Sequence, residues 1–266
     1  MNRPHTHSLE HMIALITGAG RGIGRALAMA MARRGAQTVV VSRTGEEVER
    51  VADEIRESGG KAMPYVVDVG QWDQVWRMVR EVVNDLGPID LLVNNAGVVV
   101  PVGPFYRVDP VQWGHTIDTN LLGAVFCTRA VVEHMIPRRT GRILSIVSGM
   151  GQRVFPGFSA YSVSKAGLIH FTRIVAEEVR EYGILVTALD PGLVDTSMHE
   201  QLRAMAPEDV GHDMHARLIG YKNQGLLKSP GLVGEMILEF LTRSCMEVTG
   251  EIIGLGEFQR TYNEGV

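Results

Sequence analysis

Seven short runs of mostly β-branched apolar residues recur along the chain, and helix-length amphipathic segments separate them. The runs lie at residues 13–17, 38–42, 64–67, 91–94, 143–147, 185–189 and 252–255. Runs that are apolar at nearly every position are typical of strands covered on both faces of a sheet. Strands that alternate with helices in this way predict an α/β fold, a doubly wound, seven-stranded parallel sheet with helices on both faces.

The segments between the runs carry apolar residues at three- and four-residue spacing. Ile23, Leu27 and Ala30 form one such stripe, and Gly35 follows where that helix is expected to end. No linker or low-complexity stretch interrupts the pattern, so residues 12–266 are predicted to form a single domain after a flexible arm, 1–11. The least regular stretch, 195–229, is interpreted as a partly helical, mobile lid over a substrate site beyond a strand end.

Composition excludes several classes of protein. A net charge of −4 over 266 residues gives no basic surface for nucleic acid. No stretch approaches the roughly 20 apolar residues that span a bilayer, the polar amino-terminus has no signal core, and two cysteines favour a reducing cytoplasm. The histidines at 5, 7 and 11 and in segment 209–215 match no metal-ligand spacing, so no metal site is predicted.

The first apolar run leads directly into a glycine-rich turn, Thr17-Gly18-Ala19-Gly20-Arg21-Gly22-Ile23-Gly24. Glycines let a backbone turn sharply and approach a pyrophosphate closely, and the amino-terminus of the following helix favours an anion. The turn differs from Gly-x-Gly-x-x-Gly, because Ile23 replaces the last glycine, and it lacks the lysine of a Walker loop. The residues expected to contact a dinucleotide here are Gly18, Gly20, Arg21, Gly22, Ile23 and Gly24.

The end of the second run indicates which dinucleotide is bound. An acidic residue there would accept hydrogen bonds from the ribose 2′-hydroxyl, whereas an arginine accommodates a 2′-phosphate. This run ends Ser42-Arg43-Thr44, with no carboxylate at its tip. Arg21 can add a second guanidinium, which suits phosphate. The sequence therefore favours NADP(H) over NAD(H), with Ser42, Arg43 and Arg21 as contacts; the alternative is that both arginines are solvated surface charges.

Tyr161 and Lys165 lie one turn apart on the same face of a predicted helix. A neighbouring ammonium and an oxidised nicotinamide would each favour the phenolate, so we expect the pKa of Tyr161 to lie below its usual value. Ser148, at the end of the preceding run, could bind a substrate oxygen. Asn120 could hold a water that relays protons to Lys165. The alternatives are a strand-end hydroxyl for Ser148 and a packing amide for Asn120.

Taken together, these residues resemble the short-chain dehydrogenase/reductase family over about residues 13–255, which implies a Rossmann fold. The turn matches the family's Thr-Gly-x-x-x-Gly-x-Gly, and Asn94-Asn95-Ala96-Gly97 matches a segment that supports the sheet and lines the cofactor. The resemblance implies a catalytic tetrad of Asn120, Ser148, Tyr161 and Lys165. The further cofactor contacts that it implies are Asp68, Val69, Asn95, Ala96, Gly97, Tyr161, Lys165, Pro191, Gly192, Val194 and Thr196.

The resemblance also implies roles. Tyr161 would be the general acid in reduction and the base in oxidation, and Lys165 would bind the nicotinamide ribose. Ser148 would polarise the carbonyl. Family members are usually homotetramers or dimers packed through the helices that contain Asn120 and Tyr161, so a homo-oligomer is expected. The chain departs from the family after its last strand, where residues 254–258 replace an Asp-Gly-Gly-like turn, which leaves the role of the polar tail open.

The predicted substrate site is mostly apolar. Residues 98–101 line it together with Ser148, Met150, Phe155, Leu193 and Met198. No cationic pair is visible in the sequence for a carboxylate, which favours a small hydrophobic ketone, aldehyde or secondary alcohol. The alternatives are a 3-oxoacyl-acyl-carrier-protein reductase, an NAD-dependent alcohol dehydrogenase, or a dinucleotide-binding protein without activity. A serine hydrolase is excluded, because no Gly-x-Ser-x-Gly elbow exists.

Overall fold

The computed structural model describes residues 9–243 and 248–263. Its centre is one parallel sheet of seven strands in the order β3-β2-β1-β4-β5-β6-β7. The strands are β1 (Ile13–Thr17), β2 (Gln37–Ser42), β3 (Lys61–Val66), β4 (Leu91–Asn94), β5 (Gly141–Ile146), β6 (Ile184–Asp190) and β7 (Ile252–Gly254). The predicted seven-stranded, doubly wound α/β fold is therefore confirmed, although most strand ends differ from the predicted ones.

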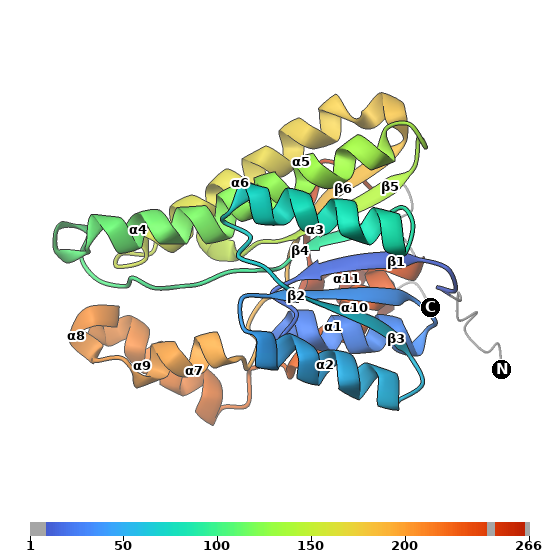
Figure 1. Ribbon diagram of the computed structural model, residues 1–266. Helices are drawn as coiled ribbons and strands as arrows, with labels where there is room; N and C mark the ends of the chain where they lie inside the picture. Colours follow the sequence, from blue (N-terminus) through green and yellow to red (C-terminus); the bar gives the residue numbers. More distant parts are fainter. Residues whose placement is uncertain (1–8, 244–247, 264–266) are drawn as a thin grey trace.

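Helices cover both faces of this sheet (Figure 1). One face carries α1 (Gly22–Arg33), α2 (Gly45–Glu57) and α10 (Pro230–Arg243), and the other carries α3 (Trp72–Asp85), α5 (Gly123–Met135) and α6 (Ser159–Glu178). Helix α4 (Pro110–Ile117) precedes α5. Helix α11 (Leu255–Asn263) follows β7 directly and includes the first part of the polar tail.

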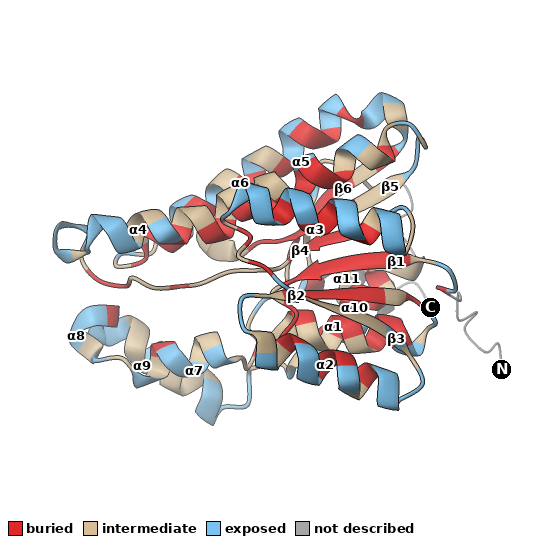
Figure 2. Ribbon diagram, in the orientation of Figure 1, coloured by how far each residue is buried: buried red, intermediate tan, exposed pale blue. Residues whose placement is uncertain are grey.

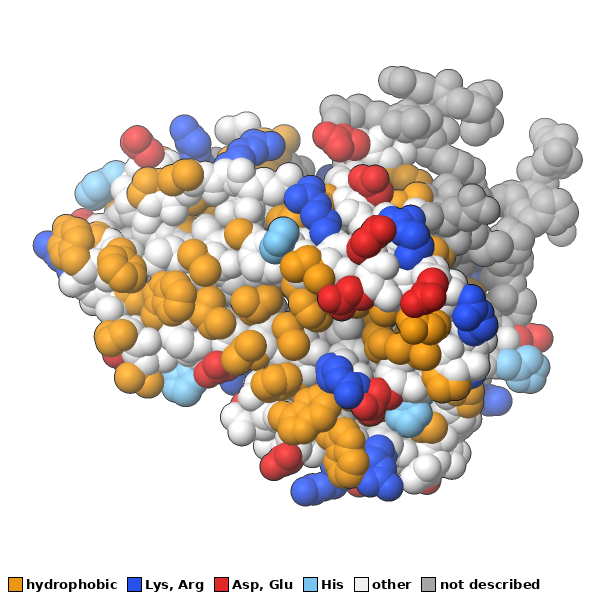
Figure 3. Space-filling view, turned by 90° about the horizontal axis from the view of Figure 1, so that it is seen from above, with side chains coloured by type: hydrophobic (Ala, Val, Ile, Leu, Met, Phe, Trp, Pro, Cys, Tyr) orange, Lys and Arg blue, Asp and Glu red, His pale blue; other side chains and the backbone are white. Residues whose placement is uncertain are grey.

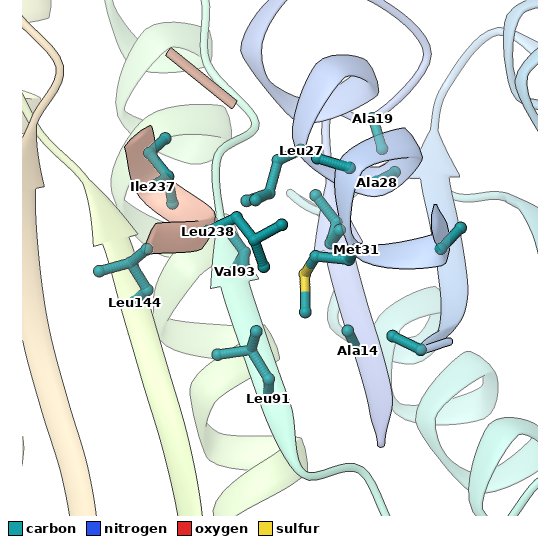
Figure 4. Packing of buried hydrophobic residues seen from close by; sticks show 14 of the residues in the cluster. Ala14, Ala19, Leu27, Ala28, Met31, Leu91, Val93, Leu144, Ile237 and Leu238 are labelled. Atoms are coloured by element: carbon teal, nitrogen blue, oxygen red, sulfur yellow. The ribbon is translucent and has the colours of Figure 1, made fainter. Parts of the chain in front are cut away.

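The apolar runs supply two cores, one on each face of the sheet. Ile16 packs toward α1 and α10, whereas its neighbour Leu15 packs toward α3 and α5, because successive side chains of a strand point to opposite faces. Figure 2 shows the central strands buried along their length. The first core is seen in Figure 4, where Leu27, Met31, Ile237 and Leu238 of the two helices lie over Ala14, Leu91, Val93 and Leu144 of the strands.

The largest difference from the predicted strands is at β3, which begins at Lys61 rather than at residue 64. It lies at the edge of the sheet and is only partly buried, so its first residues need not be apolar. An edge position also tolerates Pro64, since proline can donate no hydrogen bond to a second neighbour. The apolar pattern therefore located this strand but not its beginning.

The structure describes only the last three residues, 9–11, of the predicted amino-terminal arm. Leu9 is buried against the first core, and its backbone N–H donates to Arg34 O at 2.9 Å. Residues 1–8, with two of the three amino-terminal histidines, lie outside the described residues. Leu9 therefore belongs with the folded domain rather than with an arm.

The irregular stretch after β6 forms three short helices, α7 (Ser197–Ala204), α8 (Pro207–Val210) and α9 (His212–Asn223). They lie apart from the two helix layers (Figure 1). A β-bridge between Val194 and Lys228 joins the two ends of this excursion, with Asp195 N donating to Lys228 O at 2.9 Å. The excursion therefore leaves and rejoins the domain at one point, beside the carboxyl end of β6.

Candidate active site

A cavity of about 610 Å³ lies at the carboxyl ends of the strands, where open α/β sheets bind ligands. Most of the predicted site residues line it. They are Gly18, Gly20, Arg21, Gly22, Ile23, Ser42, Arg43, Val69, Asn95, Ala96, Gly97, Ser148, Met150, Phe155, Tyr161, Lys165, Pro191, Gly192, Leu193, Val194, Thr196 and Met198. Five predicted residues are not part of this wall: Gly24, Asp68, Asn120, Val100 and Pro101.

The glycine turn is held against the segment after β4. Thr17 Oγ1 accepts hydrogen bonds from Asn95 N at 3.0 Å and Ala96 N at 3.1 Å, and Asn95 Nδ2 donates to Thr17 O at 2.8 Å. Gly18 has a φ of +63°, and a Cβ added there would lie 2.8 Å from Ala96 Cα. The turn therefore needs glycine at Gly18 for both its backbone conformation and its close packing.

Gly24 was predicted to contact the dinucleotide, and the structure places it elsewhere. A Cβ added at Gly24 would lie 2.5 Å from both Asn95 Nδ2 and Gly18 O. This glycine therefore lets helix α1 pack closely behind the turn and does not face the cavity. Asp68 also differs from its prediction, because its carboxylate closes a turn by accepting from Gly70 N at 3.0 Å while its neighbour Val69 lines the wall.

The end of β2 carries one charge that the sequence did not reveal. Arg21 and Arg43 line the cavity as predicted, and Glu47 from the first turn of α2 lines it too. A Cβ added at Gly20 would lie 2.7 Å from Glu47 Oε2 and 3.2 Å from Ser42 Oγ. A carboxylate therefore lies beside the tip of β2, although it comes from the following helix rather than from the strand end.

Asn120 lies behind the wall in a π-helical turn, η2 (Asp118–Leu122), between α4 and α5. It is buried, and its side chain bridges two elements: Oδ1 accepts from Val98 N at 2.8 Å, and Nδ2 donates to Val98 O at 2.8 Å and Ser164 Oγ at 3.0 Å. The side-chain amide is thus occupied by protein partners. The amide therefore fixes the segment after β4 to α6, and the contact of Asn120 with a relay water stays a prediction.

Tyr161 and Lys165 lie one turn apart near the start of α6, and both are buried. Lys165 Nζ lies 5.7 Å from the centre of the Tyr161 ring and donates to Ile146 O at 2.8 Å. Ser148 follows β5 and hydrogen-bonds the Tyr161 side chain. These three predicted residues therefore converge on one part of the cavity, and Gly97 lines the same wall.

Burial dominates the ionisation of this group. It raises the pKa of Tyr161 to about 12; the hydrogen bond from Ser148 lowers that pKa, and the nearby Asp190 carboxylate raises it. Burial also lowers the pKa of Lys165 to about 8. Loss of hydration therefore outweighs the hydrogen bond from Ser148. The predicted lowering of the Tyr161 pKa included an oxidised nicotinamide, so it stays a prediction for the cofactor-bound protein.

The lowered pKa of Lys165 gives stability a defined pH dependence. Between pH 8 and 10.5 an unfolded lysine binds a proton that the folded protein does not, so this residue makes unfolding less favourable as pH rises through that window. We expect the wild type to gain on the order of 3 kcal/mol relative to Lys165→Met from pH 8 to 10.5. Urea unfolding of both proteins at pH 7.5 and 10 checks this, and a constant difference would contradict it.

The part of the cavity near α7 and α9 is largely apolar, as predicted. Met150, Phe155, Leu193 and Met198 line it, whereas only the first two residues of the predicted segment 98–101 do. The lining residues that the sequence did not single out include Thr44, Glu47, Thr119, Arg153, Asp190, His199 and Tyr221. Arg153 and His199 therefore add polar groups to a wall that was expected to be apolar.

Two kinds of feature are absent from the described residues. No three His, Cys, Asp or Glu side chains among them gather where they could hold a metal ion. Nor does any helix within residues 9–243 and 248–263 have the length and apolar character needed to cross a membrane.

Comparison with known proteins agrees with this geometry. The short-chain dehydrogenase family profile matches residues 12–207. The 3-oxoacyl-acyl-carrier-protein reductase of Thermotoga maritima is 34% identical over 247 residues, 93% of this chain and 97% of that protein. An NADP-bound structure from Beutenbergia cavernae aligns with a TM-score of 0.82 and 31% identity over 93% of this chain and 96% of its own. The structure of NAD⁺-bound xylitol dehydrogenase aligns with a TM-score of 0.84 and 28% identity, over 92% of this chain and 98% of its own.

The chain therefore belongs to the short-chain dehydrogenase family. It is an oxidoreductase that acts on CH–OH or C=O groups with NAD(P) as its cofactor.

Proposed function

We propose that this chain uses NADP(H) to interconvert a hydrophobic ketone or aldehyde and the corresponding alcohol, with Tyr161 as the general acid and base. The observation that carries the proposal is the position of the Tyr161 side chain, hydrogen-bonded to Ser148 in the same cavity as the glycine turn. The substitution Tyr161→Phe tests this proposal, because it removes the hydroxyl and should abolish most of the turnover.

The residues present fit a dinucleotide. Gly18, Gly20 and Gly22 line the cavity, and the amino-terminus of α1 at Gly22 offers backbone N–H groups to a pyrophosphate. We infer that Ile23, Asn95 and Thr196 line the same path toward Tyr161, with the other predicted contacts in the wall. When bound, the nicotinamide supplies or accepts the hydride.

In reduction, the Tyr161 hydroxyl donates its proton to the substrate oxygen, and the Ser148 hydroxyl orients that oxygen. Because burial keeps the pKa of Tyr161 near 12, the phenol is protonated at neutral pH and ready to donate. Lys165, held by Ile146 O, supplies a nearby proton donor whose pKa of about 8 is close to neutrality.

Cofactor preference gives a separate prediction. Arg21 and Arg43 can bind a 2′-phosphate, while the Glu47 carboxylate repels one. We expect kcat/KM to be higher with NADPH than with NADH, Arg43→Gln to lower that ratio about tenfold, and Glu47→Gln to raise it. Initial rates with both reduced cofactors check this. A wild-type preference for NADH would contradict the proposal and favour the NAD-dependent alternative.

The carrier-protein alternative is favoured by one observation, the similarity to 3-oxoacyl-acyl-carrier-protein reductases. An acidic carrier would need a basic patch beside the cavity. Arg138, Arg139 and Arg142 do not supply it: Arg138 pairs with Asp90 at 2.5 Å, and Arg142 begins β5 at the opposite end of the sheet. Rates on a carrier-bound 3-oxoacyl chain and on the free ketone would distinguish the two substrates.

We also propose that the chain forms a homo-oligomer through the face made by α3–α6. Hydrophobic side chains gather on this face toward α4 (Figure 3). The exposed apolar residues on these helices are Trp72, Trp76, Val111, Val163 and Ile174. An apolar surface of this kind is typical of an association site. Light scattering that gave a monomer at micromolar concentration would contradict the proposal.

A further inference from the structure

One cation in the cavity wall, Arg153, takes part in neither the proposed cofactor binding nor the proposed proton transfer. The cationic wall residues Arg21 and Arg43 lie at the glycine turn and the end of β2, and Lys165 donates to Ile146 O. Arg153 lines the same cavity, but within residues 9–243 and 248–263 its guanidinium has neither a salt bridge nor a hydrogen bond. An arginine in a cavity wall without a protein partner is available to an anionic ligand.

Backbone hydrogen bonds hold the Arg153 main chain close to Ser148. Gly151 N donates to Ser148 O at 2.9 Å, and Arg153 N donates to Gly149 O at 3.1 Å, so the residues after Ser148 form a tight turn, η3 (Gly149–Gly151). This turn packs against α6, because a Cβ added at Gly151 would lie 2.8 Å from the Lys165 carbonyl carbon. Arg153 is therefore anchored close to Ser148, with an exposed side chain at the mouth of the cavity.

A second polar group reaches the cavity from α7. His199 lines it, and its ring Nδ1 is enclosed without a hydrogen-bond partner in the described structure. Arg203, one turn further along α7, does not line the cavity, and its Nη2 contacts Asp195 Oδ1 at 3.3 Å. His199 Nε2 is not enclosed in this way, so it is the ring nitrogen that can reach a ligand in the cavity.

The carboxylates nearest to this region do not compete for Arg153. Asp190 Oδ1 accepts from Gly192 N at 3.0 Å, and the two oxygens of Asp195 contact Arg203 and Lys222. Neither lies within salt-bridge distance of Arg153. Met150 and Phe155, which line the same cavity, belong to the apolar cluster that contains Tyr161.

We propose that the substrate carries a carboxylate in addition to its reacting carbonyl, and that Arg153 binds this carboxylate at the cavity mouth while His199 donates a second hydrogen bond. The inference deepens the proposed function and rests on it. A guanidinium donates two parallel hydrogen bonds to a carboxylate, and the apolar wall accommodates the chain between the two groups. The substrate is thus an oxo acid with an aliphatic or aromatic body rather than a neutral ketone.

The test compares oxo acids of increasing carbonyl-to-carboxylate separation with their methyl esters, using the full chain and NADPH. For the best separation, we expect the acid to exceed its ester in kcat/KM by about tenfold, since the anion stays partly hydrated. Arg153→Gln should remove this advantage and leave the ester unchanged. His199→Gln should reduce it, and Arg173→Gln, an exposed arginine of α6 outside the wall, should have no effect.

Binding separates this inference from the proposed reaction. Calorimetric titration of the same protein with decanoate and with decanamide requires no turnover, and we expect decanoate to bind about tenfold more tightly, through Arg153. If decanoate binds in this way but no ketone is reduced, the proposed function fails and the anion site stands. Equal rates for acids and esters, or equal affinity for decanoate and decanamide in wild type and Arg153→Gln, would overturn the inference.

Discussion

Tyr161→Phe is expected to lower kcat by about 10²- to 10⁴-fold, because it removes the hydroxyl that gives its proton to the substrate oxygen. The ring should keep its packing, since Tyr161 lies in the apolar cluster with Val99, Phe158 and Leu202. Cofactor binding should also persist, because the glycine turn and its partner Asn95 are unchanged. Steady-state rates and fluorescence titration with NADPH measure the two properties separately.

Tyr182→Phe is the matched control for this substitution. Tyr182 belongs to the short helix η4 (Arg180–Tyr182), outside the cavity wall, and loses the same hydroxyl. Its kcat should remain within twofold of the wild type. If Tyr161→Phe turned over at a similar rate to this control, Tyr161 would not be the proton donor.

Gly18→Ala is expected to have the largest effect on stability and cofactor binding. Its φ of +63° costs a residue with a Cβ about 1–2 kcal/mol, and the new methyl group would lie 2.8 Å from Ala96 Cα, where backbone atoms cannot easily move. Overpacking adds about 1–3 kcal/mol. We therefore expect a loss of several kcal/mol in the free energy of unfolding and at least a tenfold weaker affinity for NADPH.

Gly59→Ala separates the two causes. Gly59 also has a positive φ, +84°, but a Cβ added there would meet nothing within 4 Å. It should lose only the conformational part, about 1–2 kcal/mol, and bind NADPH normally. Equal losses for the two variants in urea unfolding would show that packing against Ala96 is unimportant.

The sequence predicted the parts of this site that depend on local order. A glycine turn directly after the first strand must lie at a carboxyl end of the sheet, so Gly18 and Gly20 could be placed without a structure. Tyr161 and Lys165 could be paired because helical spacing puts them on one face. The same reasoning misplaced Gly24, since helix packing against Asn95 depends on a contact between distant segments.

Other features required the tertiary structure. Glu47 reaches the end of β2 because α2 begins beside Gly20. Arg153 follows β5 and His199 lies in α7, so these two lining residues are far apart in the sequence. The direction in which the Tyr161 pKa is shifted also depends on burial, which the spacing of residues in the sequence does not reveal. Local pattern therefore predicts the fold, the proton-transfer pair, Arg21 and Arg43, whereas Glu47, Arg153 and His199 could be placed in the cavity wall only from the tertiary structure.

The transfer of deuterium to a ketone from NADPH that carries deuterium at both C4 positions tests the central proposal most directly. In single turnovers followed by mass spectrometry, the wild type should form an alcohol with deuterium on the former carbonyl carbon. Tyr161→Phe should bind the deuterated cofactor and form almost none of this alcohol in the same time. An alcohol without deuterium on that carbon, or equal deuterium transfer by Tyr161→Phe, would contradict the proposed reaction.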